Sequence, residues 1–230
     1  MPTIVFASPK GGAGKSTSAV LLATQLAETG KKVVIIDADP NRPVSRWAKR
    51  PGKPDQLTVL DDVTEETIIR TIEGAKTTAH FVVVDLEGTA SMMVAYAISR
   101  ADLVVIPTQG SQLDAAEAVK AIRLVRKQEE AFRLSIPAAV LFTRTNAAIR
   151  PRSLQSIEAE FSRAGVTMFD VRVHEREAYR ALFSFGGTLA SLDPAQVPNI
   201  PAAVENARAF AAEAVALLKA SHAQQVQEVA

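Results

Sequence analysis

Short apolar runs alternate with stretches of helical periodicity along the whole chain. The apolar runs predict strands at residues 3–8, 32–37, 57–60, 80–85, 102–107, 136–142 and 165–171. The periodic stretches predict helices at residues 15–29, 63–74, 89–99, 111–130, 152–163, 175–184 and 201–220. Strands that alternate with helices, and that are apolar throughout, are typical of a parallel sheet covered on both faces. The pattern therefore predicts an α/β fold with a doubly wound, mostly parallel sheet flanked by helices.

No repeat and no low-complexity linker divides the 230 residues. A chain of this length can bury a large core in one unit. We expect a single domain over residues 1–220, followed by a flexible C-terminal tail over residues 221–230.

A glycine-rich segment, residues 9–17, lies between the first predicted strand and the first predicted helix. Strand, glycine turn and helix N-terminus together form the usual setting of a phosphate-binding loop, in which backbone N–H groups surround phosphate oxygens. Lys15 is expected to reach the β- and γ-phosphates, and the Ser16 hydroxyl to ligate Mg²⁺. The alternative is a glycine-rich turn that binds nothing. The residues expected to contact nucleotide here are Gly11, Gly12, Ala13, Gly14, Lys15, Ser16 and Thr17.

Carboxylates end two of the buried strands. Asp37 and Asp39 follow the second strand and, two residues apart, should point the same way, towards the loop if the strands are neighbours. Asp85 ends the fourth strand in the Walker B arrangement and would hold Mg²⁺, which commonly keeps several of its waters. For Asp37 and Asp39 the alternative is a polar strand end that caps the next helix.

Composition narrows the function classes. The chain has 26 basic and 25 acidic residues, so bulk charge does not indicate a nucleic-acid partner, and any DNA contact must come from local clusters. With no cysteine, thiol catalysis and thiolate-held clusters are excluded. No apolar run approaches the length of a membrane span, and the chain begins directly with a strand; we expect a cytoplasmic protein without membrane attachment.

The loop has a second lysine, Lys10, directly before the double glycine, and D-x-D-P occupies residues 37–40. These motifs resemble the deviant phosphate-loop ATPases of the ParA/MinD family. The resemblance implies Mg²⁺-dependent ATP hydrolysis, with Asp37 supporting the hydrated ion and Asp39 orienting the attacking water. It also implies that Lys10 crosses to the partner's nucleotide in an ATP-dependent homodimer, where an added cation would neutralise charge on the γ-phosphate. Lys10 could instead be an ordinary surface lysine.

The second half of the chain resembles short ParA partitioning ATPases more loosely. In relatives, the segment that corresponds to residues 141–146 borders the adenine, which implies base contacts for Thr143, Arg144 and Asn146; a turn-forming Asn146 would look the same. An S-F-G-x-T element at residues 184–188 follows a group of arginines, which in such relatives grip DNA phosphates without reading bases. The alternative is a solvated face paired with Glu175 and Glu177. The predicted DNA-contacting group is Arg150, Arg152, Arg172, Arg176 and Arg180, the last two on one helical face.

The resemblance implies an ATP-bound dimer that binds DNA nonspecifically on the nucleoid and is released when a ParB-like or other adaptor stimulates hydrolysis. The cargo would be a plasmid or a chromosome region. Three alternatives stay open: positioning of a protein cargo such as a receptor cluster or microcompartment, assistance in conjugative DNA transfer, and a membrane-patterning ATPase. A metabolic phosphate-loop enzyme is a fourth, although reductases of this fold need cysteines that the chain lacks.

Overall fold

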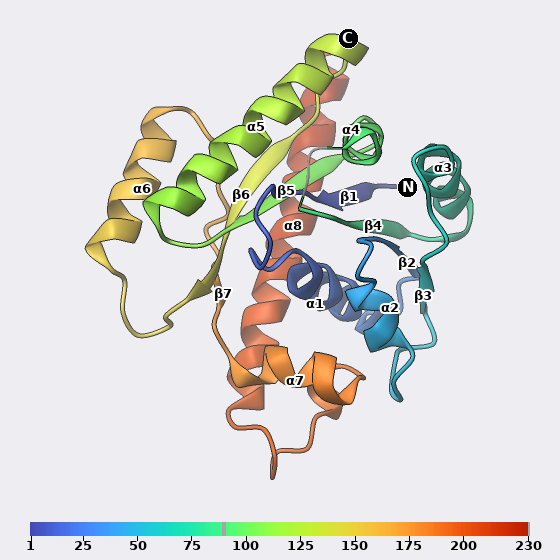
Figure 1. Cartoon of the computed structure of the whole chain (residues 1–230), viewed down its shortest axis with the longest axis vertical. Helices are drawn as coiled ribbons and strands as arrows, with labels where there is room; N and C mark the ends of the chain where they lie inside the picture. Colours follow the sequence, from blue (N-terminus) through green and yellow to red (C-terminus); the bar gives the residue numbers. More distant parts are fainter. Residues whose placement is uncertain (89–90, 230) are drawn as a thin grey trace.

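The computed structural model describes residues 1–88 and 91–229, with side chains to residue 223. Its centre is a seven-stranded sheet in the order β3-β2-β4-β1-β5-β6-β7, and every strand pair is parallel (Figure 1). The strands are β1 (Thr3–Phe6), β2 (Val33–Ala38), β3 (Leu57–Leu60), β4 (Phe81–Leu86), β5 (Leu103–Thr108), β6 (Ala138–Thr145) and β7 (Val173–His174). The predicted parallel sheet is confirmed.

Helices cover both faces of this sheet, as predicted. They are α1 (Lys15–Glu28), α2 (Pro43–Ala48), α3 (Ile68–Thr78), α4 (Met92–Ile98), α5 (Gln112–Phe132), α6 (Arg152–Arg163), α7 (Glu177–Phe185) and α8 (Ile200–Val229), with a short 3-10 helix η1 (Leu189–Ser191). One hydrophobic core joins the sheet to α1, α2, α7 and α8, and the other joins it to α3, α4, α5 and α6. None of the helices in the described part of the chain is both long and apolar enough to cross a membrane.

The central strands are mostly apolar because both of their faces are buried. In β4, Val83 packs into the core under α1 and α8, whereas its neighbours Val82 and Val84 pack into the opposite core. This alternation follows from the two-residue period of a strand. In β2 and β4 the run is apolar up to Asp37 and Asp85, which lie near the carboxyl ends of the two strands.

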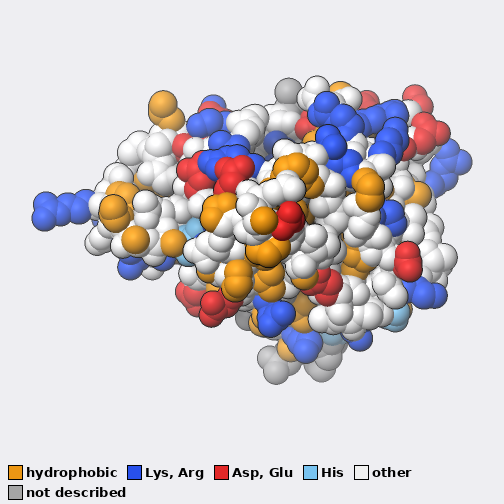
Figure 2. Space-filling view, turned by 90° about the horizontal axis from the view of Figure 1, so that it is seen from below, with side chains coloured by type: hydrophobic (Ala, Val, Ile, Leu, Met, Phe, Trp, Pro, Cys, Tyr) orange, Lys and Arg blue, Asp and Glu red, His pale blue; other side chains and the backbone are white. Residues whose placement is uncertain are grey.

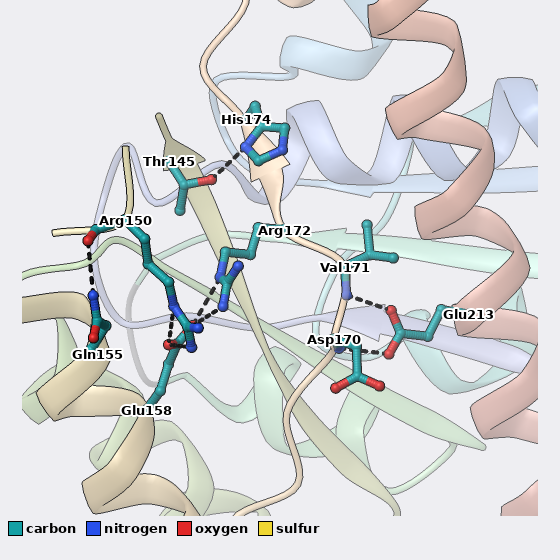
Figure 3. A network of polar contacts seen from close by, with 9 residues as sticks. All are labelled: Thr145, Arg150, Gln155, Glu158, Asp170, Val171, Arg172, His174 and Glu213. Atoms are coloured by element: carbon teal, nitrogen blue, oxygen red, sulfur yellow. Dashed lines mark hydrogen bonds and ion pairs between the residues drawn. The ribbon is translucent and has the colours of Figure 1, made fainter. Parts of the chain in front are cut away.

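The seventh strand lies later in the sequence than predicted. The apolar run at residues 165–171 predicts a strand, but the structure forms only an isolated bridge there, between Met168 and Val140. The backbone N–H groups of Asp170 and Val171 donate instead to the Glu213 carboxylate on α8, at 2.7 and 2.9 Å (Figure 3). The Glu213 side chain thus accepts from backbone N–H groups that would otherwise be available to a neighbouring strand. Strand pairing with β6 begins only at β7.

Helix boundaries differ from prediction in four places. Helix α2 was not predicted, and α3 lies about four residues later than expected. The predicted start of α4 at residue 89 lies outside the described residues. Helix α7 begins at Glu177, so Arg176 is its extended N-cap and does not share a helical face with Arg180, which corrects that part of the prediction. Helix α8 continues to Val229 although we placed its end at residue 220; the division into a domain and a flexible tail stays a prediction.

Candidate functional site

The glycine-rich loop connects the end of β1 to the start of α1 at the carboxyl edge of the sheet. Gly12 and Gly14 have φ angles of 75° and 97°, in the left-handed region that glycine adopts without strain. Gly14 is the N-cap of α1, and no side chain caps the helix, so its first N–H groups face the cavity of the loop. A helix N-terminus of this kind is suited to binding phosphate.

Lys15 is buried beneath the loop, with only 6% of its surface exposed. Its Nζ donates weakly, at 3.4 Å each, to the backbone oxygens of Ser8 and Lys10. Burial lowers the pKa of Lys15, and the nearby carboxylates of Asp85 and Asp39 oppose that shift. An ammonium held by two long hydrogen bonds can exchange them for stronger contacts to a phosphate oxygen.

Asp37 and Asp85 lie side by side, in register on the adjacent strands β2 and β4. Asp37 Oδ2 accepts from the backbone N–H of Ser45 at 2.7 Å. Its other oxygen and both oxygens of Asp85 have no hydrogen-bond partner among the described residues, although Asp85 is completely buried. The Ser16 hydroxyl lies near enough to lower the pKa of Asp85 somewhat, but burial dominates and raises it to about 7.

Orphaned buried carboxylates next to a phosphate loop fit a hard cation such as Mg²⁺, which prefers oxygen ligands. The described residues include no cluster of three or more acidic or histidine side chains that would hold a metal without help. Mg²⁺ does not require one, because it usually binds through one or two carboxylates together with phosphate oxygens and water. Ser16, Asp37 and Asp85 therefore suit an ion that arrives with a nucleotide.

The protonation of Asp85 leads to a test in the absence of nucleotide. Its pKa is raised from 3.8 to about 7, so the folded state binds the proton more tightly than the unfolded chain. The stabilisation from this group is therefore complete below pH 3.8 and is lost as the pH rises through about 7. Burial raises the pKa of Asp37 as well, so both acids act in the same direction.

We accordingly expect Asp85→Asn to gain stability relative to the unmodified protein as the pH rises from 5 to 8, by an amount on the order of a few kcal/mol. Thermal unfolding of both proteins across this range, without nucleotide or Mg²⁺, measures the difference. Parallel melting curves at all pH values would contradict a raised pKa for Asp85.

Asp39 follows β2 and is only partly buried. Its Oδ1 accepts from the N–H of Asn41 at 2.8 Å, which forms a turn before α2. The same carboxylate lines a cavity of about 500 Å³ above the loop, together with Lys15, Glu87 and Arg144. Asp39 therefore faces the space that the phosphates would fill, and its turn contact leaves the other carboxylate oxygen available.

The segment after β4 closes over the loop. A Cβ atom on Gly88 would lie 3.3 Å from the nitrogen of Gly11 and from the oxygen of Pro9. The two backbones thus touch at a point where any side chain would push them apart. A change at the phosphates would be felt directly at Gly88, which is the contact that a nucleotide-sensing switch needs.

The three predicted adenine contacts have different surroundings. Thr143 is buried, and its hydroxyl donates to the Ala13 oxygen at 2.7 Å, so this residue supports the loop from beneath. Asn146 Oδ1 accepts from the N–H groups of Ala148 and Ile149, at 2.8 and 3.1 Å, as a turn-forming residue would. Arg144 is exposed and lines the cavity of the loop. Their base contacts stay predictions.

A second cavity, of about 340 Å³, adjoins the loop at Gly14 and Arg144. His174, Tyr179 and Phe183 from β7 and α7 form its other wall, and sequence reasoning gave none of them a role in binding. His174 Nδ1 lies 2.9 Å from the Thr145 hydroxyl, and burial lowers its pKa, helped by Arg176 and Arg172. The sequence Val173-His174-Glu175, directly before α7, is the feature from which these lining residues could have been predicted. This partly aromatic cavity beside the loop is large enough to hold a small planar group.

Lys10 has 40% of its side chain exposed, but its ammonium is not free. Its ammonium forms an ion pair with Asp114, whose side chain is 4% exposed. Asp114 stands in the first turn of α5 and also binds the hydroxyl of Ser111, the N-cap of that helix. This buried partner was not predicted, although S-x-x-D at residues 111–114 is a recognisable capping pattern. Lys10 is thus held by its own chain in this structure.

Three of the five arginines of the predicted group are paired with carboxylates, and Figure 3 shows two of them, Arg150 and Arg172. Arg150 and Arg172 both pair with Glu158 of α6, the latter through two hydrogen bonds of 2.8 and 2.6 Å. Arg180 pairs with Glu175 and Glu177, at 2.7 and 2.9 Å, as the alternative interpretation expected. Arg152 begins α6, and Arg176 precedes α7. The five arginines therefore do not form a continuous unpaired stripe.

Comparisons with known proteins identify the family and the fold of this chain. A family model described as VirC1 protein matches residues 1–224. Protein ParA of Rhizobium radiobacter is 46% identical over 211 residues, covering 92% of this chain and 95% of the relative. Protein virC1 of Rhizobium rhizogenes is 29% identical over 187 residues, covering 79% and 80%. The structure of the Cyanothece McdA(D38A)–ATP complex superposes with a TM-score of 0.69 at 18% identity, covering 91% of this chain and 95% of that one.

Proposed function

We propose a function for this chain, which belongs to the VirC1 family of ParA/MinD-type ATPases. It would be a Mg²⁺-dependent ATPase that dimerises around ATP and binds DNA. The observation that carries the proposal is the loop itself. It combines an uncapped helix N-terminus and a buried lysine with two adjacent buried carboxylates that have unpartnered oxygens. These groups are complementary to a triphosphate and its cation.

ATP would place its phosphates in the cavity of the loop and its base in the adjoining cavity beside Tyr179. The loop N–H groups and Lys15 would bind the phosphate oxygens. Ser16, Asp37 and Asp85 would hold Mg²⁺, which would neutralise charge on the β- and γ-phosphates. The structure of McdA(D38A) in complex with ATP supports this choice of nucleotide through the shared fold.

Dimerisation would bring Lys10 to the partner's nucleotide. That step requires Lys10 to leave Asp114, so the ion pair would keep the lysine within its own chain until ATP is bound. Asp39 would orient the water that attacks the γ-phosphate. This task depends on the position of the carboxylate more than on its basicity.

DNA binding by the ATP-bound dimer, and release when an adaptor protein of the ParB type stimulates hydrolysis, would give a cycle that moves DNA. The cargo would be a plasmid or a chromosome region, and the protein would gather on the nucleoid. The match to the VirC1 model favours one second candidate, assistance in conjugative DNA transfer. Arg150, Arg172 and Arg180 would contribute to DNA binding only after phosphates displace Glu158, Glu175 and Glu177.

We expect Lys15→Ala to weaken ATP binding at least about 30-fold. That factor corresponds to about 2 kcal/mol, the lower range for truncating one partner of a buried charge pair. Titration calorimetry with a nonhydrolysable ATP analogue and Mg²⁺ measures it. Lys31→Ala, at an exposed position after α1, removes the same charge and should bind like the unmodified protein. Equal affinity for all three proteins would overturn the nucleotide site.

A further inference from the structure

Helix α2 and the turn after it carry a face of exposed basic side chains. Residues 42–53 include five lysines and arginines and no acidic residue. Four of these side chains are exposed, and we call them the α2 basic face: Arg42, Arg46, Lys49 and Arg50. The fifth, Lys53, donates to the backbone oxygens of Leu57 and Pro54.

This face is not balanced by acidic neighbours. In the part of the chain that the structure describes, its one recorded ion pair is Arg42 with Asp61, at a long 3.8 Å. Some exposed cations elsewhere are paired more closely, as Arg180 is with Glu175 and Glu177 at 2.7 and 2.9 Å. Since the whole chain has a net charge of +1, the rest of the molecule is net negative. Arg46 on α2 and Lys49 and Arg50 in the turn after it lie close together in sequence, and their like charges repel one another.

The segment that carries the α2 basic face packs against residues 186–187, which follow α7. Trp47, with 1% of its surface exposed, donates from Nε1 to the Gly187 oxygen at 3.1 Å. A Cβ on Gly186 would lie 2.4 Å from the Cβ of Arg50, so the turn packs closely against the segment after α7. Seen from below, Lys and Arg side chains gather at the upper right of the surface, on the side where Figure 1 places α2 (Figure 2).

The same helix is tied to the nucleotide site. The N–H of Ser45, in the first turn of α2, donates to Asp37, one of the proposed Mg²⁺ ligands. Arg42 adopts a left-handed conformation, with φ of 46°, in the turn that leads from Asp39 into the helix. A change at Asp37 or Asp39 would therefore shift the helix that carries the basic side chains.

From these contacts we propose that the α2 basic face binds the phosphates of double-stranded DNA in the ATP-bound state. The inference rests on the proposed ATPase and DNA-binding function and gives that function its main contact surface. Phosphate contacts of this kind need no base readout. An anionic membrane is the less suitable occupant, because helices that bind membranes insert an apolar face, and the apolar residues Val44 and Trp47 of α2 are buried.

The test compares two triple variants that lose the same charge. The first is Arg46→Gln, Lys49→Gln, Arg50→Gln; the second is Arg123→Gln, Arg126→Gln, Lys127→Gln, which removes three exposed cations from α5. Fluorescence anisotropy with labelled duplex DNA of random sequence, with ATP and Mg²⁺, is measured over a series of salt concentrations. We expect the first variant to bind at least about tenfold more weakly, with a salt slope shallower by about 2 to 3, and the second to bind like the unmodified protein.

Each other outcome overturns the inference. Equal loss in both triple variants would show that only net charge matters, and loss in the α5 variant alone would place the contact there. If the unmodified protein binds anionic vesicles in sedimentation but not DNA, the face belongs to a membrane. Calorimetric ATP binding and light scattering of the dimer are measured on the same samples. If these are intact while DNA binding is insensitive to the α2 variant, the surface assignment fails and the ATPase proposal stands.

Discussion

Replacing Lys10 with alanine is expected to abolish the ATP-dependent dimer while ATP still binds to the single chain. Lys10 would supply its charge to the partner's triphosphate, and loss of a positioned cation at developing phosphate charge is among the costliest changes such a site can suffer. Light scattering with ATP and Mg²⁺ should give the mass of one chain at concentrations where the unmodified protein gives the mass of two. Calorimetry should show an affinity for a nonhydrolysable analogue within a few-fold of the original.

The ion pair with Asp114 supplies an informative companion variant. Asp114→Asn keeps a side-chain oxygen that can accept from the Ser111 hydroxyl, and its backbone N–H can still donate to that hydroxyl, but it removes the charge that holds Lys10. The lysine would then be free to cross, so dimers should form at lower ATP concentration than in the unmodified protein. A full-strength dimer of Lys10→Ala would refute the role of this lysine in the partner's site. Unchanged dimerisation of Asp114→Asn would show that the ion pair does not restrain it.

Asp39→Ala is expected to stop hydrolysis and leave a long-lived ATP-bound dimer. The carboxylate lines the cavity above the loop and is only partly buried, so we expect ATP to bind without it. Removing a group that positions the attacking water should lower the rate of phosphate release by about 100-fold or more. Phosphate release and size-exclusion chromatography with ATP measure the two effects on one sample.

Asn41→Ala is the matched control for Asp39. It lies in the same turn, and its contact to Asp39 comes from its backbone N–H, so the turn should persist without the side chain. This variant should hydrolyse ATP normally. Normal hydrolysis by Asp39→Ala would remove the assignment, whereas loss of ATP binding would show that Asp39 supports the turn and not the reaction.

The DNA surface shows how ion pairs alter an interpretation based on sequence. Arginines near one another in sequence suggested a stripe, but Glu158 binds two of them and Glu175 and Glu177 bind a third. Displacing a carboxylate offsets part of what a phosphate contact would gain. Exposed cations without such partners, as on α2, release counterions to solvent when they bind DNA and pay no comparable cost.

Local sequence was sufficient for the architecture of the sheet and for the phosphate loop. Strands apolar on both faces, glycines at left-handed positions and a helix that starts at Lys15 are all encoded within a few residues of one another. The two-residue period of a strand and the preference of glycine for left-handed turns depend on neighbouring residues only. Both can therefore be recognised from the sequence before the fold is known. The exception was β7, where a distant residue, Glu213, binds the backbone donors that the apolar run alone would have assigned to a strand.

Contacts between distant segments were decided by the tertiary structure alone. Asp114 holds Lys10 across 104 residues, Thr143 supports Ala13 across 130, and Trp47 reaches Gly187 across 140. The sequence by itself determined that this chain has a nucleotide loop with acidic strand ends beside it. The tertiary structure decided which cations are paired and which carboxylates lack partners. An ion pair requires two side chains to be close in space, and this proximity produces no periodic pattern along the sequence.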